Sequence, residues 1–229
     1  MIKLYFVAIY FIFGYNVCSA QFAVVNDPDG YSNLREAPGK SKIITQLKNG
    51  TIVYGLPEPE NKWQIVDYSF DPIKTGYIHI DRLDYIDNLP SIPITHNSKN
   101  TAVLSDGKIT ITVEISKFDA SRHKLSFYKD NKNMLHKIDN LTFLGTDGGI
   151  PAWEYKSIVI SIHGKDIIIP EDDLSHIYEP NLSSTIANYD TKKNILYLHS
   201  ANSDGAGGYE VLWIIDSDTY KGRHLMQGF

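Results

Sequence analysis

Short apolar runs separated by turn pairs fill residues 29–83, and this pattern restricts the fold of the chain more than any other feature. Apolar runs of this length with turn residues between them are typical of strands in a small all-β module. Pro38-Gly39 is a turn pair because proline presets φ and glycine accepts positive φ. Asn49-Gly50 is a stronger signal, since both residues tolerate the positive φ of a tight hairpin. The stretch therefore predicts a compact β module with a small core.

Four separated motifs of this stretch occur in the order found in a known protein family. They are Asp29-Gly30-Tyr31-Ser32-Asn33-Leu34-Arg35, Ser41-Lys42-Ile43-Ile44, Lys62-Trp63-Gln64-Ile65-Val66 and Gly76-Tyr77-Ile78-His79-Ile80. Over about a quarter of its length the chain thus resembles the bacterial SH3 domain, a small β-barrel module of secreted and cell-envelope proteins. The resemblance implies an SH3-like barrel over residues 21–87, a place in the cell envelope, and a cell-wall peptide or an envelope protein as the partner.

Residues 67–75 depart from the family pattern, because they are longer than a tight hairpin and rich in aromatic and turn residues. A loop on a rigid barrel is a common place for binding specificity. We therefore expect Tyr68 and Phe70 to lie outside the barrel and to contact a ligand, since aromatic faces bind peptides and sugars with little loss of entropy. We expect Trp63 and Tyr77 to lie inside or half inside.

Residues 1–20 have the pattern of a secretory signal peptide. Lys3 supplies the positive start, residues 4–13 supply the apolar core, and small residues precede a cut before Gln21. The apolar run is shorter than the roughly twenty residues that a membrane span needs. We therefore expect a periplasmic or secreted mature chain without a membrane span. Cys18 is the only cysteine, so cleavage leaves no disulfide, thiol nucleophile or thiolate metal site, whereas the alternative is a lipid on Cys18.

Charge and motifs argue against several functional classes. The net charge is −5, and no basic run is present that would follow a phosphate backbone, so we expect no nucleic-acid partner. The eight histidines are scattered without the i, i+4 spacing of a helical zinc motif, so we expect neither a metal nor another cofactor. The chain lacks a Gly-x-Ser-x-Gly motif, and its mature form lacks cysteine, so nucleophilic catalysis has no support.

The rest of the chain indicates a linker and a second β domain. Residues 88–104 contain two prolines and a polar tail without periodicity, which predicts a linker. Residues 105–229 return to strand patterns: apolar and polar residues alternate over 109–115, and hairpins are expected at 155–169 and at the C-terminal end. A short helix is expected over 170–178, where proline precedes an acidic first turn. We therefore predict a mainly all-β chain, with a small SH3-like barrel followed by a mostly antiparallel β domain of unrecognised family with one short helix.

Two loops of the second domain, 145–154 and 202–210, share a pattern. Each has a hydroxyl residue, Asp-Gly, further glycine, and then an aromatic residue and Glu at the head of a strand. The simpler interpretation is two long hairpin loops. Because glycine lets a backbone approach a ligand closely, we predict that the loops form one contact surface, with aromatic anchors and with aspartates that select a basic partner. The prediction rests on the two following strands being neighbours in one sheet and running in the same direction. Its candidate residues are Asp147, Trp153, Glu154, Asp204, Tyr209 and Glu210.

Three functions remain open. The favoured one is an exported, non-enzymatic binding protein of the bacterial cell envelope, whose SH3-like barrel binds a cell-wall peptide or protein and whose second domain binds another partner. The second is an inhibitor or immunity protein whose glycine loops plug the active site of a cell-wall hydrolase or toxin. The third is a hydrolase with a carboxylate pair, which depends on the spatial separation of the two groups. For that pair the candidates are Glu154, Asp172 and Asp173.

Overall fold

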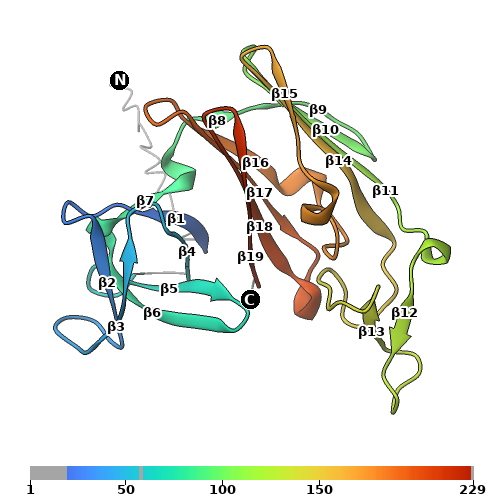
Figure 1. The fold of residues 1–229 in the computed structure, drawn as a ribbon, viewed down its shortest axis with the longest axis horizontal. Coiled ribbons are helices and arrows are strands. Elements are labelled where there is room, and N and C mark those ends of the chain that lie inside the picture. The colour runs from blue at the N-terminus through green and yellow to red at the C-terminus, as the bar shows by residue number, and fades with distance from the viewer. Residues whose placement is uncertain (1–19, 57–58, 228–229) are drawn as a thin grey trace, which may run out of the picture.

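The computed structural model describes residues 20–56 and 59–227, and there the chain is mainly antiparallel β structure with short 3-10 turns (Figure 1). The predicted all-β class is confirmed. The strands form an N-terminal module, over residues 20–89, and a larger β-sandwich, over residues 91–226. The predicted signal peptide lies outside the described residues except for Ala20.

Seven strands of the N-terminal module form one curled antiparallel sheet in the order β3-β2-β6-β5-β4-β1-β7. The predicted turns hold, because Gly39 and Gly50 have φ of 80° and 86° at the β2–β3 and β3–β4 connections. The side chains of Leu34, Val53 and Val66 are fully buried in the core of this module. The strands are β1 (Gln21–Val25), β2 (Tyr31–Arg35), β3 (Ile43–Lys48), β4 (Ile52–Gly55), β5 (Trp63–Phe70), β6 (Ile73–His79) and β7 (Leu83–Tyr85).

The binding loop expected at 67–75 is instead a hairpin. Strand β5 continues to Phe70 and β6 begins at Ile73, so two residues turn the chain. The register shifts between Asp67 and Ser69, and the extra residue in β5 made the segment look too long for a hairpin. Tyr68 packs against the core of the module rather than projecting from it. Phe70 is half-buried, as are Trp63 and Tyr77, for which burial was expected.

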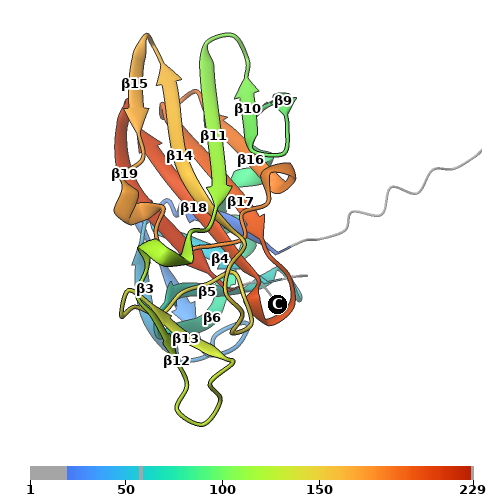
Figure 2. The ribbon, with the colours of Figure 1, turned by 90° about the vertical axis from the view of Figure 1, so that its right-hand side faces the viewer.

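The second module is a sandwich of two five-stranded sheets, ordered β15-β14-β11-β10-β9 and β19-β18-β17-β16-β8 (Figure 2). The predicted alternation is confirmed in β11, where Ile109, Ile111, Val113 and Ile115 are buried. A two-stranded ribbon, β12 (Leu125–Phe127) with β13 (Leu135–Ile138), lies apart from both sheets. The sandwich strands are β8 (Ser91–Ile92), β9 (Ile94–Asn97), β10 (Thr101–Ser105), β11 (Ile109–Lys117), β14 (Trp153–Ile162), β15 (Lys165–Ile168), β16 (Thr185–Asp190), β17 (Ile195–Asn202), β18 (Tyr209–Asp216) and β19 (Thr219–Met226).

The linker predicted at 88–104 is part of the sandwich. Strand β8 pairs with β16 in one sheet, and β9 pairs with β10 in the other, so the chain changes sheets at Pro93. Proline suits this position because it has no N–H to donate to either ladder. Ile92 is buried in the sandwich core. Strands of two and four residues are too short to show periodicity, which is why the segment resembled a linker.

The helix predicted at 170–178 is reduced to one 3-10 turn, Glu171–Asp173. His176 has φ of 61°, outside the right-handed helical region, so the chain leaves the helical path there. Ile177 then forms a β-bridge with Leu144. Tertiary pairing therefore replaces the local helical preference.

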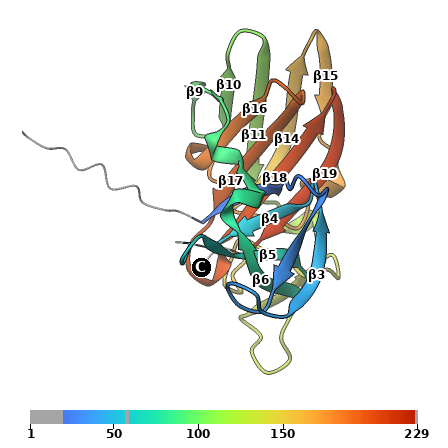
Figure 3. The same cartoon turned by 90° about the vertical axis from the view of Figure 1, so that its left-hand side faces the viewer.

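The N-terminal module packs against the outer face of the sheet that contains β17, β18 and β19 (Figure 3). Phe22 and Tyr54 from the module meet Tyr197 and Leu212 from the sandwich in one buried apolar cluster. A polar contact borders it, with the ring of His199 3.1 Å from the carboxylate of Asp87. The two modules therefore share a core, and residues 21–87 by themselves would leave part of this cluster exposed.

Candidate functional site

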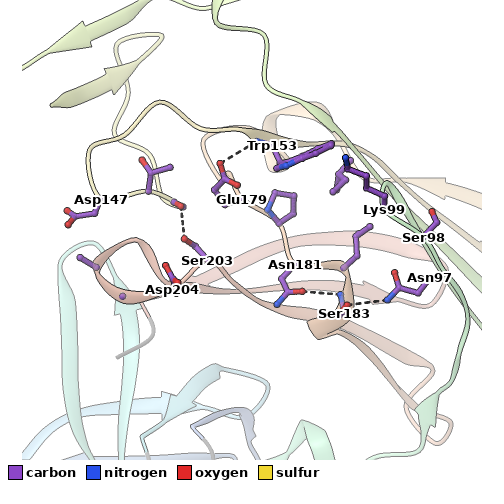
Figure 4. Close-up of a pocket in the computed structure, with 17 residues that line it drawn as sticks. Asn97, Ser98, Lys99, Asp147, Trp153, Glu179, Asn181, Ser183, Ser203 and Asp204 are labelled. Atoms are coloured by element: carbon purple, nitrogen blue, oxygen red, sulfur yellow. Dashed lines mark hydrogen bonds between the residues drawn. The ribbon is translucent and has the colours of Figure 1, made fainter. Parts of the chain in front are cut away.

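The two glycine-rich loops, 145–154 and 202–210, meet at one end of the sandwich (Figure 4). The Gly145 N–H donates to the Gly207 carbonyl over 3.1 Å, and the Ser203 hydroxyl donates to the Gly145 carbonyl over 2.6 Å. The second bond joins residues 58 apart in sequence. The predicted meeting of the loops is therefore present in the structure.

The reason for this meeting differs from the expected one. Strands β14 and β18 are not neighbours in one sheet but belong to the two facing sheets. Their side chains meet across the core, where the Tyr155 and Trp213 rings make an edge contact at 5.4 Å between centroids. Both strands begin at the same end of the sandwich, so their preceding loops share that end.

Gly207 is required by the close crossing of the two loops. A Cβ added there would lie 2.9 Å from both the Cα and the backbone nitrogen of Thr146. Real Cβ atoms essentially never approach backbone atoms so closely, so a side chain at this position would push the loops apart. The absence of a side chain at position 207 thus allows the two loops to cross closely and form adjacent walls of the site.

An open pocket of about 930 Å³ lies between the two loops, the β9–β10 turn and residues 179–183. We call it the terminal pocket. Its lining is largely polar, with side-chain amides, hydroxyls and carboxylates arranged around one indole. Seven of its 17 lining residues are small or carry an uncharged polar side chain: Asn97, Ser98, Asn181, Ser183, Ser203, Gly205 and Ala206.

Trp153 is the aromatic centre of the terminal pocket, and it is half-buried at the head of β14. The Glu179 carboxylate accepts hydrogen bonds from the backbone N–H groups of Ala152 and Trp153, the latter at 3.3 Å. The Lys99 ammonium lies 5.5 Å from the Trp153 ring centroid, a cation–π distance. Glu179 therefore fixes the backbone at Trp153, and Lys99, from the β9–β10 turn, places its ammonium near the indole ring.

The charge of the terminal pocket is predominantly negative. Asp147, Glu179 and Asp204 contribute three carboxylates, whereas Lys99 contributes the only ammonium among its lining residues. Figure 4 shows Asp147 and Asp204 at one end, Lys99 at the other, and Glu179 between them. Asp147 and Asp204 are both solvent-exposed, as a contact surface requires.

Tyr209 and Glu210 are predicted as contact residues, but neither lines the terminal pocket, and the burial of Tyr209 contradicts its role in a contact surface. Tyr209 is 2% exposed, and its hydroxyl donates to the Tyr178 carbonyl over 2.9 Å. Burial raises the pKa of this hydroxyl well above its usual value. Glu210 points to the opposite side of β18, toward Tyr54 of the N-terminal module, and burial raises the pKa of its carboxyl. Adjacent residues of a strand point to opposite faces. Tyr209 therefore faces the sandwich core and Glu210 faces the N-terminal module, and neither side chain lines the terminal pocket.

Glu154 lies in a different cavity, of about 290 Å³. Its carboxylate accepts from the Ser116 hydroxyl at 3.4 Å and lies 3.6 Å from His123 Nε2. Asp172 and Asp173, the predicted partners of Glu154 in a hydrolase, do not line this cavity, whereas the neighbouring Glu171 does.

The predicted barrel residues do not form a protruding surface. Phe70 lines a pocket of about 460 Å³ between the β5–β6 hairpin and the sandwich, together with Phe143 and Leu225. Tyr68 is not among the residues of that pocket. A separate hollow of about 310 Å³ in the N-terminal module includes Trp63 and Arg35.

Comparison with known proteins adds no relative. The chain matches no protein-family model, and neither the curated proteins nor the solved structures include a match. Among residues 20–56 and 59–227, no group of three or more His, Cys, Asp or Glu side chains is placed to hold a metal ion. No helix within those residues has the length and apolar character needed to cross a membrane.

Proposed function

We propose that the chain is an exported, non-enzymatic binding protein of the cell envelope, and that the terminal pocket is the site at which it receives a peptide or protein partner. The observation that carries the proposal is the convergence of two distant glycine-rich loops around one half-buried tryptophan. A concave site with an aromatic anchor and a few fixed polar groups is the usual form of a binding site.

The proposed compartment and the role of the N-terminal module rest on the sequence. The pattern of residues 1–20 supports export, and the likeness of residues 29–83 to the bacterial SH3 domain supports attachment to the cell wall. The hollow beside Trp63 is the surface that we propose for this attachment. The terminal pocket belongs to the sandwich and not to the N-terminal module, so it is available for a second partner.

The shape of the loops favours this function over that of an inhibitor. A plug for an active site needs loops that project into the enzyme. Here the Gly145–Gly207 and Ser203–Gly145 hydrogen bonds tie the loops to each other, and together they wall a hollow. The arrangement is therefore suited to receiving a ligand segment.

Replacing Trp153 by alanine is expected to weaken binding to an envelope protein about tenfold or more, because central aromatic anchors dominate binding energy. The measurement is capture of envelope proteins by the immobilised mature chain. Ile168→Ala is the matched control, since Ile168 is 67% exposed and outside the terminal pocket. Equal binding by the wild type and both variants would show that the pocket is not the site.

A further inference from the structure

The aromatic face in the terminal pocket already carries a cation. Lys99 belongs to the turn between β9 and β10, and its ammonium lies 5.5 Å from the Trp153 ring centroid. Tryptophan is the best aromatic partner for such a cation. The pocket thus contains a cation–π contact in which the cation is a side chain of the protein itself.

The cation over Trp153 is held by the ring rather than by a carboxylate. Within the described part of the chain, no carboxylate oxygen lies within 4.0 Å of the Lys99 ammonium. Lys99 is solvent-exposed, and its four-carbon stem is flexible. A contact of this kind at an exposed site is weak. Another cation can therefore replace Lys99 without breaking a buried ion pair.

The remaining charges of the pocket also favour a positive ligand. Asp147 and Asp204 lie at the end of the pocket away from Lys99 (Figure 4), and Glu179 lies between. An anionic ligand would face three carboxylates, whereas a basic segment would be attracted to all of them.

We propose that Lys99 is a stand-in for a ligand cation, and that the terminal pocket binds a peptide segment bearing lysine or arginine whose cationic group displaces Lys99 from Trp153. This inference rests on the proposed function, because it names the chemistry of the partner at the same site. Lys99 then competes with the ligand cation for the Trp153 ring, so removing the charge of Lys99 improves ligand binding.

The sign of the Lys99→Ala effect tests this inference by titration calorimetry of the mature chain with tetralysine. Lys99→Ala is expected to tighten tetralysine binding about two- to fivefold, because the internal competitor is lost. Lys99→Arg keeps a cation and is expected to bind like the wild type. Trp153→Ala is expected to weaken binding whatever residue stands at position 99. Tetraglutamate and an uncharged oligosaccharide serve as comparison ligands.

Three results would overturn the inference. They are weaker tetralysine binding by Lys99→Ala, tighter wild-type binding of the oligosaccharide or tetraglutamate than of tetralysine, and no wild-type binding of tetralysine at millimolar concentration. The first indicates that Lys99 contacts the ligand directly, and the second that the pocket prefers a ligand without a cationic group. Envelope-protein binding that still depends on Trp153 would leave the proposed function intact, so the two failures are distinguishable.

Discussion

Replacing Trp213 by alanine is expected to lower the free energy of unfolding by about 3–5 kcal/mol. Trp213 is 1% exposed in the sandwich core, and its ring makes an edge contact with Tyr155. Its indole N–H donates to the Asp173 carbonyl over 3.2 Å. The substitution therefore leaves a large cavity and removes the donor to that carbonyl. Urea unfolding followed by circular dichroism measures the loss.

Trp63→Ala in the N-terminal module is the matched control for that experiment. Trp63 is only half-buried, and its ring contacts His79 edge-on at 5.4 Å between centroids. Less apolar area returns to water when this ring is removed, so the loss of stability is expected to be smaller. Equal losses for the two variants, or a loss below about 1 kcal/mol for Trp213→Ala, contradict the packing described for the sandwich.

Gly207→Ala is expected to cost about 1–3 kcal/mol of stability and to weaken binding at the terminal pocket. The added Cβ would lie 2.9 Å from backbone atoms of Thr146, so one loop must move. The φ of Gly207 is not positive, so the substitution acts through crowding rather than through backbone strain. Thermal unfolding and capture of envelope proteins by the immobilised chain measure the two effects.

Gly149→Ala provides the matched control, because an added Cβ there has no atom within 4 Å and the φ of Gly149 is not positive either. Its stability and binding are expected to stay close to those of the wild type. If Gly207→Ala behaves like Gly149→Ala, the contact between the loops does not shape the pocket.

Local chemistry explains the parts of the fold that could be predicted. The Asn49-Gly50 turn and the alternation over 109–115 depend on φ preferences and on a period of two, and each is contained within a few residues. The shared pattern of 145–154 and 202–210 also correctly indicated a common location. It did so despite a wrong premise about the sheet, because two facing sheets also bring strand ends together.

Tertiary context explains the parts that could not be predicted. Residues 88–104 are strands only because their neighbours in two sheets pair with them. Lys99 comes from that segment, so its place over Trp153 had no local signal. Tyr209 was assigned to the surface because it follows a loop, but register turns its ring inward. Each error concerns which face or sheet a residue joins, and long-range pairing decides this.

The most direct test of the terminal pocket as the binding site is an NMR titration that follows the indole N–H signals of Trp63, Trp153 and Trp213. On addition of tetralysine, the Trp153 signal is expected to shift progressively, because the ligand cation replaces Lys99 on that ring. The signals of Trp63, in the N-terminal module, and of Trp213, in the sandwich core, are expected to stay in place. A shift of the Trp63 signal with Trp153 unchanged would place the binding site in the N-terminal module and contradict the account.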